Sequence, residues 1–299
     1  MMIDPRMTTQ ISAKLGFLAA LDQSGGSTPG ALRTYGIPDS AYRGDEEMFR
    51  LIHEMRVRII TSPAFSGDKI IGAILFEKTM DGHVAGKPVP AYLWEDKGVV
   101  PFLKIDKGLE PEADGVSLMK PIPELDALLE RAVKLAIFGT KERSTIHLAS
   151  KTGIASIALQ QFEVAKQVLR HGLIPILEPE VLITSPNKAE AEALLRDALL
   201  KGLDGLSGDQ KVMIKLTIPE VPDLYKPLTE HPRVVRIVAL SGGYDLADAC
   251  RRLSQNHGMI ASFSRALIDN LKFEMSEAEF DATLAKAVDA IYEASTVKV

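Results

Sequence analysis

Short apolar runs, rich in β-branched residues, recur along the chain and predict eight β-strands. Most segments between them are amphipathic, with apolar residues returning at the three- and four-residue spacing of a helix. Strands that alternate with helices are typical of a parallel sheet covered by helices. The predicted strands span residues 17–22, 70–77, 99–106, 136–141, 173–180, 211–219, 234–243 and 259–267.

The helix that begins after Ser276 is the most clearly patterned segment. Ser276 and Glu279 have the spacing of a capping box, which satisfies free backbone N–H groups at the start of a helix. Similar apolar stripes predict helices around residues 48–55 and 157–169, whereas residues 78–98 predict only a short helix. The apolar face of the last helix consists of Phe280, Leu284, Val288 and Ile291.

Eight strand–helix units in a chain of 299 residues favour a closed barrel over an open sheet. A (β/α)8, or TIM, barrel usually needs about 250 residues. We find no Gly/Ser linker, low-complexity tract or block of like charge that would mark a domain boundary. The sequence therefore predicts the α/β class, with one (β/α)8 barrel domain over residues 1–299 and an irregular N-terminal extension at 1–12.

Composition narrows the possible partners and compartment. The formal net charge is -5, so no overall bias toward nucleic acid or an anionic membrane is expected. Trp94 and the scattered tyrosines suggest no stacking platform for nucleic acid. No apolar run is long enough for a membrane span, and residues 1–15 do not resemble a signal peptide. Cys250 is the only cysteine, which favours a reducing compartment and a cytoplasmic location.

Charged and hydroxyl side chains gather where the predicted strands end. In a (β/α)8 barrel all eight C-terminal strand ends lie on one face, where active sites form. Residues far apart in the sequence should therefore meet in one polar ring. Its candidate members are Asp22, Glu77, Lys104, Asp106, Lys141, Arg143, Glu178, Glu180, Lys215, Ser241 and Arg265.

The alternation of side chains along a strand predicts which of these groups face the barrel interior. In strand 211–219 the even-numbered positions from Val212 to Ile218 are apolar and should face the helices, whereas Lys215 should face inward. The pairs at 104 and 106, 141 and 143, and 178 and 180 likewise share a side of their strands. Interior polar groups are costly unless they serve one another or a ligand.

Lys215 is the candidate nucleophile of this ring. Burial and a neighbouring cation, such as Lys141, both favour the neutral amine of a lysine. A neutral amine attacks a ketone and forms an imine, which then withdraws electrons from the substrate. Imine formation expels water and needs an acid nearby to transfer protons, for which Glu178 is the candidate.

Two candidate anion sites flank this lysine. Ser241, Gly242 and Gly243 follow the seventh predicted strand and Arg265 closes the eighth, where barrels frequently bind phosphate. Glycines let backbone N–H groups approach phosphate oxygens, and an arginine adds bidentate contacts. A second glycine-rich loop spans residues 24–27. Together with Lys104 and Arg143 it offers a second phosphate site, which suggests a bisphosphate substrate.

Seven segments in this order resemble class I fructose-bisphosphate aldolases, in particular the short bacterial type. The resemblance covers nearly the whole chain after the first dozen residues. Each segment alone is weak, and the ordered set at barrel spacing is specific. The segments are Leu21-Asp22-Gln23-Ser24-Gly25-Gly26-Ser27, Lys104-Ile105-Asp106-Lys107-Gly108, Lys141-Glu142-Arg143, Pro175-Ile176-Leu177-Glu178-Pro179-Glu180, Met213-Ile214-Lys215, Leu240-Ser241-Gly242-Gly243 and Phe263-Ser264-Arg265-Ala266-Leu267.

The resemblance implies reversible cleavage of fructose 1,6-bisphosphate to dihydroxyacetone phosphate and glyceraldehyde 3-phosphate, in glycolysis and gluconeogenesis. It implies a Schiff base on Lys215 and no metal ion or other cofactor. Glu178 would be the general acid/base, with Glu180 beside it, and Asp22 and Lys141 would act on the C4 hydroxyl and in the carbinolamine steps. The ketone-side phosphate would bind at Ser241, Gly242, Gly243 and Arg265, and the far phosphate at Ser27, Lys104 and Arg143.

The sequence departs from the animal enzymes of this family in two places. Those enzymes carry a long C-terminal tail ending in a tyrosine that assists proton transfer. Here only 34 residues follow Arg265, and Tyr292 falls inside the final predicted helix, so the group that protonates the enamine is open. The animal enzymes also have an arginine where this chain has Ala31, and Arg33 lies nearby.

Less specific interpretations remain for several residues and for the chain. Glu180 could be an acid at a helix N-terminus, Asp106 a structural partner of Lys107 or Lys141, and Glu77 a structural partner of the interior lysines. The six histidines show no metal-ligand spacing, which disfavours a zinc-dependent aldolase. Two alternative functions remain open. One is another barrel aldolase that uses a Schiff base, such as a transaldolase-like enzyme, and the other is a barrel that binds a cytoskeletal or host surface protein. We expect sugar phosphates as small-molecule partners and a homo-oligomer.

Overall fold

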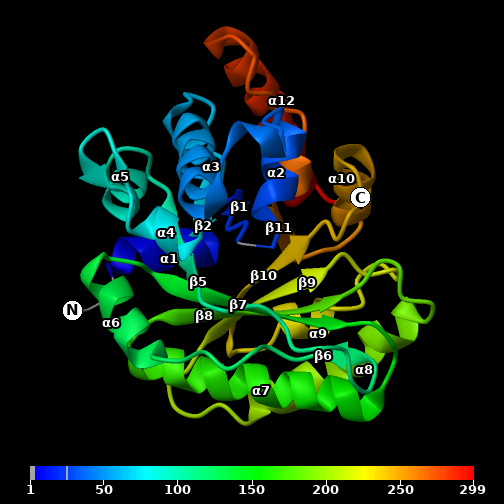
Figure 1. The fold of residues 1–299 in the computed structure, drawn as a ribbon. Coiled ribbons are helices and arrows are strands. Elements are labelled where there is room, and N and C mark those ends of the chain that lie inside the picture. Colours follow the sequence, from blue (N-terminus) through cyan, green and yellow to red (C-terminus); the bar gives the residue numbers. More distant parts are fainter. Residues whose placement is uncertain (1–3, 25) are drawn as a thin grey trace.

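The eight predicted strands close into a parallel barrel in the computed structural model, which describes residues 4–24 and 26–299 (Figure 1). The sheet has nine strands, of which β6 (Val116–Ser117) pairs antiparallel with β7, leaving eight parallel strands in the barrel. Pairing between β5 and β7 closes the ring. The barrel strands are β1 (Phe17–Leu21), β2 (Ile70–Leu75), β5 (Val100–Lys104), β7 (Gly139–Ile146), β8 (Ile174–Val181), β9 (Val212–Thr217), β10 (Val234–Leu240) and β11 (Met259–Phe263).

The fold class is therefore confirmed, but the bounds predicted for the fourth strand are wrong. Ala136 has a positive φ of 57° and belongs to the turn after helix α6, so β7 begins at Gly139. The strand then continues to Ile146, because its second half pairs with β8 and with β6. Polar residues in this half hid the strand in the sequence. Lys141 and Arg143 consequently lie within the strand rather than at its end.

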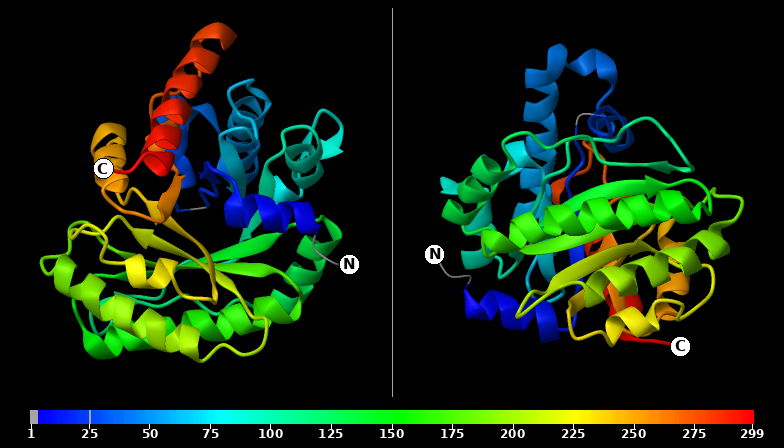
Figure 2. Two further views of the ribbon diagram at one scale, coloured as in Figure 1. Left: turned by 180° about the vertical axis from the view of Figure 1, so that it is seen from behind. Right: turned by 90° about the horizontal axis from the view of Figure 1, so that it is seen from below.

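Helices surround the barrel, and Figure 2 shows α7 and α8 side by side outside the sheet. The predicted stripes correspond to α3, α7 and α12, and the capping box at the start of α12 is present. The segment after β2 contains α4, a short hairpin of β3 (His83–Val84) and β4 (Lys87–Pro88), and α5. Among the described residues, no helix is long and apolar enough to cross a membrane.

The helices outside the barrel are α2 (Thr28–Tyr35), α3 (Gly44–Thr61), α4 (Glu77–Met80), α5 (Val89–Glu95), α6 (Leu125–Lys134), α7 (Lys151–Arg170), α8 (Lys188–Asp204), α9 (Lys226–Thr229), α10 (Leu246–Ser254), α11 (Arg265–Ile268) and α12 (Glu277–Thr296), with a 3-10 turn at Asp39–Ala41.

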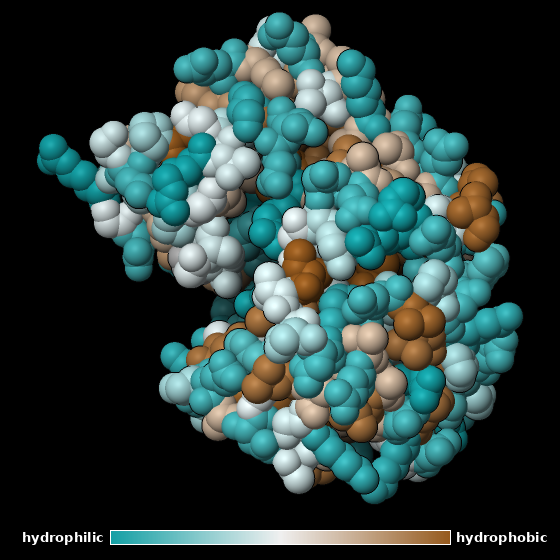
Figure 3. All heavy atoms as spheres, turned by 90° about the vertical axis from the view of Figure 1, so that its right-hand side faces the viewer, coloured by the Kyte–Doolittle hydropathy of each residue, from teal (hydrophilic) through white to brown (hydrophobic). Residues whose placement is uncertain are grey.

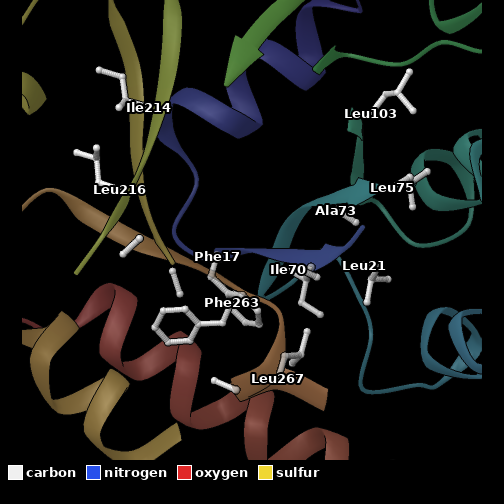
Figure 4. Packing of buried hydrophobic residues seen from close by; sticks show 14 of the residues in the cluster. Phe17, Leu21, Ile70, Ala73, Leu75, Leu103, Ile214, Leu216, Phe263 and Leu267 are labelled. Atoms are coloured by element: carbon white, nitrogen blue, oxygen red, sulfur yellow. The ribbon is translucent and has the colours of Figure 1, made fainter. Parts of the chain in front are cut away.

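Strand alternation divides the apolar residues into two clusters. The larger cluster lies between the sheet and the helices, and Figure 4 shows Phe263 and Leu267 of this cluster beside the helices. The smaller cluster fills the barrel interior and includes Phe102 and Phe138, whose rings meet edge to face at 5.3 Å. On β9, Ile214 belongs to the outer cluster and Met213 to the inner one, as the sequence predicts.

The predicted irregular N-terminal extension is instead a helix over most of its length. Helix α1 (Pro5–Ala13) starts at the N-cap Asp4, while residues 1–3 lie outside the described part of the chain. Met7 and Ile11 pack into the interior cluster. Arg236, near the start of β10, donates to the backbone oxygen of Ile11 at 3.0 Å. The helix therefore covers the N-terminal mouth of the barrel, opposite the predicted polar ring.

Replacing Ile11 by Ala should lower the free energy of unfolding by about 2–4 kcal/mol, because the Ile11 side chain is fully buried and its truncation leaves a cavity. Leu15→Ala, at a neighbouring position that is 61% exposed, serves as the control and should change stability by less than about 0.5 kcal/mol. Denaturant unfolding of both variants measures this difference. Equal effects would show that α1 does not close the barrel.

Candidate active site

The C-terminal strand ends surround one open cavity of about 640 Å³. Eleven of the twelve predicted site residues line it, and the lining set does not include Gly243. Gly243 lies at its edge, where a Cβ atom would stand 3.5 Å from the Arg265 guanidinium. The eleven are Asp22, Ser27, Lys104, Lys141, Arg143, Glu178, Glu180, Lys215, Ser241, Gly242 and Arg265.

Four of these side chains form one connected set of buried ion pairs, here called the central ion-pair cluster. Lys141 Nζ lies 2.6 Å from Asp22 Oδ2 and 2.7 Å from Glu178 Oε2. Lys215 Nζ lies 3.0 Å from Glu178 Oε1. All four residues are buried, and they come from β7, β8, β9 and the residue that follows β1. The barrel thus joins charges that are widely separated in the sequence.

Burial and charge act in opposite directions on these groups. Burial raises the pKa values of Asp22 and Glu178, but the ammonium groups of Lys141 and Lys215 outweigh it and hold both values below the usual range. Burial lowers the pKa of Lys141, but the two carboxylates outweigh it and raise that pKa above its ordinary value. Asp22, Glu178 and Lys141 are therefore all charged at neutral pH.

Two further cations that line the cavity are also paired with carboxylates. Lys104 Nζ contacts Asp106 Oδ1 at 2.6 Å, and Arg143 Nη1 contacts Glu180 Oε2 at 2.8 Å. Burial lowers the pKa of Lys104, while Asp106 opposes this shift. Lys104 is thus the partner of Asp106, in place of the two lysines considered from the sequence. These pairs neutralise the cations on this side of the cavity when no ligand is bound.

Glu77 lies apart from this set. It pairs with Lys107 at 2.6 Å and with Arg131, and it is not among the residues that line the cavity. Its partners are surface cations rather than the interior lysines considered from the sequence. Glu77 is therefore a structural ion-pair partner outside the cavity.

The loop after β10 requires its glycines. Gly242 and Gly243 have φ values of 63° and 122°, which L-residues rarely adopt. A Cβ atom on Gly242 would stand 2.7 Å from the Ile183 side chain. Ser241 is buried next to them. In the loop after β1, Ser27 Oγ contacts the Ser24 backbone, while Gly25 lies outside the described residues.

The two departures from the animal enzymes can be located. Ala31 lines the cavity, whereas Arg33 does not and pairs with Asp39 at 2.8 Å on the exposed surface. Tyr292 has its ring 5.9 Å from Lys69 Nζ, just before β2 begins. That position is at the N-terminal end of the barrel, so Tyr292 cannot reach the cavity. Tyr35 lines the cavity instead.

Sequence reasoning missed three polar residues around this cavity. Gln23 and Ser264 line it and are joined by a hydrogen bond of 2.7 Å. Each is the neighbour of a predicted site residue, which was the available signal. Arg56 lies behind them on α3, and it donates to the Gln23 backbone oxygen at 2.5 Å. Its place in an apolar helix stripe gave no indication of this contact.

Replacing Lys141 by Met should lower the free energy of unfolding by about 3–5 kcal/mol at pH 7, because two buried carboxylates lose their shared cation. Because the pKa values of Asp22 and Glu178 are lowered in the folded protein, both groups stabilise it at pH values above their ordinary pKa values of 3.8 and 4.5. This stabilisation is lost as the pH falls below those ordinary values toward the lowered ones. The difference in the free energy of unfolding between Lys141→Met and the unmodified protein should therefore become smaller below pH 4.5.

Denaturant unfolding at a series of pH values measures this difference. Lys166→Met, which breaks an exposed pair with Glu163, is the control and should cost no more than about 1 kcal/mol at any pH. A constant difference between the Lys141→Met variant and the unmodified protein from pH 7 to pH 3 would contradict the account of the cluster.

Comparisons with known proteins agree with this geometry. The family model of class-I fructose-bisphosphate aldolases matches residues 16–218. The class 1 fructose-bisphosphate aldolase of Synechocystis sp. is 57% identical over 280 residues, which cover 94% of this chain and 93% of that protein.

Two solved structures share the fold. A fructose-bisphosphate aldolase from Plasmodium falciparum, solved with TRAP and a small-molecule inhibitor, has a TM-score of 0.78 at 20% identity and covers 100% of this chain and 98% of its own. The enzyme of Slackia heliotrinireducens has a TM-score of 0.52 at 14% identity, covering 97% of this chain and 88% of its own. The match to the family model and to the Synechocystis enzyme establishes that the chain belongs to the class I fructose-bisphosphate aldolases.

Proposed function

We propose that this chain cleaves fructose 1,6-bisphosphate reversibly, through a Schiff base on Lys215, to dihydroxyacetone phosphate and glyceraldehyde 3-phosphate. One observation carries the proposal: Lys215 is buried inside the barrel, 3.0 Å from Glu178, in a cavity with candidate phosphate-binding residues on both sides. Family membership supports the substrate class.

Glu178 is suited to the proton transfers of imine formation. The Lys215 ammonium can give a proton to the carboxylate that it contacts, and the neutral amine can then attack the C2 ketone. Glu178 Oε1 lies 3.0 Å from Lys215 Nζ and can take this proton, while Lys141 contacts the other oxygen, Oε2, at 2.7 Å. Returned to the carbinolamine hydroxyl, the same proton lets water leave and the imine form.

Asp22 and Lys141 are suited to the cleavage step. Asp22 is ionised at neutral pH and can accept the proton of the C4 hydroxyl. As that proton leaves, the C3–C4 bond breaks, its electron pair moves into the imine to give an enamine, and the aldehyde is released. Lys141, 2.6 Å from Asp22, stabilises negative charge that develops at the C4 oxygen.

The two phosphate groups of the substrate would bind at the two ends of the cavity. Ser241, Gly242, Gly243 and Arg265 would hold the ketone-side phosphate, through backbone N–H groups and the guanidinium. Ser27, Lys104 and Arg143 would hold the far phosphate. Because Lys104 and Arg143 each contact a carboxylate, the far phosphate would share these cations with Asp106 and Glu180. A bisphosphate fits two such ends better than the substrates of transaldolase-like enzymes.

The family of this chain also suggests its pathway, its cellular location and its assembly. We propose that it acts in glycolysis and gluconeogenesis in the cytoplasm, as one barrel domain that forms a homo-oligomer. On the face in Figure 3, hydrophobic residues form separated spots rather than a continuous stripe, so this face does not identify the oligomer interface.

The test is cleavage of fructose 1,6-bisphosphate in EDTA, measured by a coupled assay of the triose phosphates. The unmodified protein should turn over in EDTA, and Lys215→Met should lose at least roughly 10³-fold in kcat, because it removes the nucleophile. Lys211→Met, at an exposed position just before the start of the same strand, should retain activity. Cleavage that EDTA abolishes, or that survives in Lys215→Met, would contradict the proposal.

A further inference from the structure

We propose that Arg56 and Gln23 are positioning residues, which hold Asp22 and Arg265 in place through a chain of hydrogen bonds that ends on Ser264. This inference rests on the proposed function, since it concerns how two proposed site residues are held. The chain Arg56–Gln23–Ser264 is here called the rim strap.

The rim strap is continuous in the structure. Arg56 Nη2 donates to the backbone oxygen of Gln23 at 2.5 Å and to its Oε1 at 3.2 Å. Gln23 Nε2 donates to Ser264 Oγ at 2.7 Å. The other end of the guanidinium, Nη1, donates to Thr79 Oγ1 at 2.7 Å. One side chain from α3 therefore contacts segments that follow β1 and β2, and through Gln23 it reaches the segment that follows β11.

These three strands are neighbours in the barrel, in the order β2, β1, β11. Their C-terminal ends form one part of the cavity rim, and Gln23 and Ser264 both line the cavity. Gln23 directly follows Asp22, and Ser264 directly precedes Arg265. The rim strap therefore fixes the distance between the segment that carries the proposed C4 base and the segment that carries the proposed phosphate-binding arginine.

The burial of Arg56 argues against a role in packing alone. Arg56 is 1% exposed, and no carboxylate in residues 4–24 and 26–299 forms an ion pair with it. Burying a guanidinium without such a partner is costly, and an apolar side chain would serve packing better. Burial lowers the pKa of Arg56 to about 10, while Asp22 opposes the shift, so the side chain stays cationic at neutral pH. Its hydrogen-bond acceptors are the neutral groups of Thr79 and Gln23, and its guanidinium also lies 5.9 Å from the centre of the Phe76 ring.

Gln23 has the chemistry that this position requires. Its amide oxygen accepts from Arg56 while its amide nitrogen donates to Ser264. An ionised glutamate could accept hydrogen bonds from Arg56 and from the Ser264 hydroxyl, which can turn to donate, whereas methionine offers neither an amide oxygen nor an N–H group. Substitutions at this half-buried position can therefore keep both links or remove both, with little change in volume.

The test compares Arg56→Met, Gln23→Met and Gln23→Glu with Arg50→Met. Arg50 lies on the same helix, but it is exposed and pairs with Glu54 at 2.6 Å, away from Gln23. KM and kcat for fructose 1,6-bisphosphate are measured for each, and binding of inorganic phosphate and dihydroxyacetone phosphate is measured by calorimetry without turnover.

We expect Arg56→Met and Gln23→Met to raise KM and weaken phosphate binding by roughly 10-fold or more, since a displacement of about 1 Å at a positioning group has large effects. Their kcat should fall as well, because Asp22 is released. Gln23→Glu keeps both links, so its kcat should stay closer to that of the unmodified protein, while its added negative charge weakens phosphate binding. Arg50→Met should change neither KM nor phosphate binding.

Phosphate binding by Arg56→Met and Gln23→Met that equals that of Arg50→Met would overturn the proposal. If Arg56→Met fails to fold, the two Gln23 variants decide the question. If the proposed Schiff-base function is wrong, the unmodified protein will not cleave fructose 1,6-bisphosphate. If only the rim strap proposal is wrong, the unmodified protein will cleave it, and Arg56→Met, Gln23→Met and Arg50→Met will bind phosphate equally.

Discussion

The ammonium group of Lys141 between two buried carboxylates is the interaction on which the site depends. Asp22 and Glu178 point into a barrel whose low polarity disfavours their charge, and Lys141 lies within 2.7 Å of both. The attraction outweighs the cost of burial and keeps both acids ionised. One of these carboxylates also contacts Lys215, so the environment of the proposed nucleophile depends on the same cation.

Fold and chemistry are linked because only a closed barrel can assemble this cluster. Its members follow or belong to strands β1, β7, β8 and β9, and they meet above an apolar interior layer that includes Phe102, Phe138 and Met213. Helix α1 covers the opposite mouth of the barrel. The polar groups are therefore placed between a dry interior and an open cavity, where charges interact strongly and a substrate can still enter.

Sequence patterns were sufficient to predict the barrel and to predict that most candidate site residues share one cavity, because both follow from the periodicity of the strands. Eight apolar runs marked the strands, and the two-residue alternation placed Lys215 inside the barrel. Features without a period were missed. The second half of β7 is polar where it pairs with β6 and β8, and α1 is short. Arg56 makes its contacts through tertiary structure, with residues more than 20 positions away, so no local pattern could reveal them.

The most direct test of the proposed chemistry is borohydride reduction of the protein with dihydroxyacetone phosphate in EDTA, followed by peptide mass mapping. An imine on a buried lysine is reduced to a stable secondary amine that marks its position. The account predicts one adduct, on the peptide that contains Lys215, and none in Lys215→Ala. An adduct on another lysine, or no adduct alongside cleavage that requires a metal ion, would contradict it.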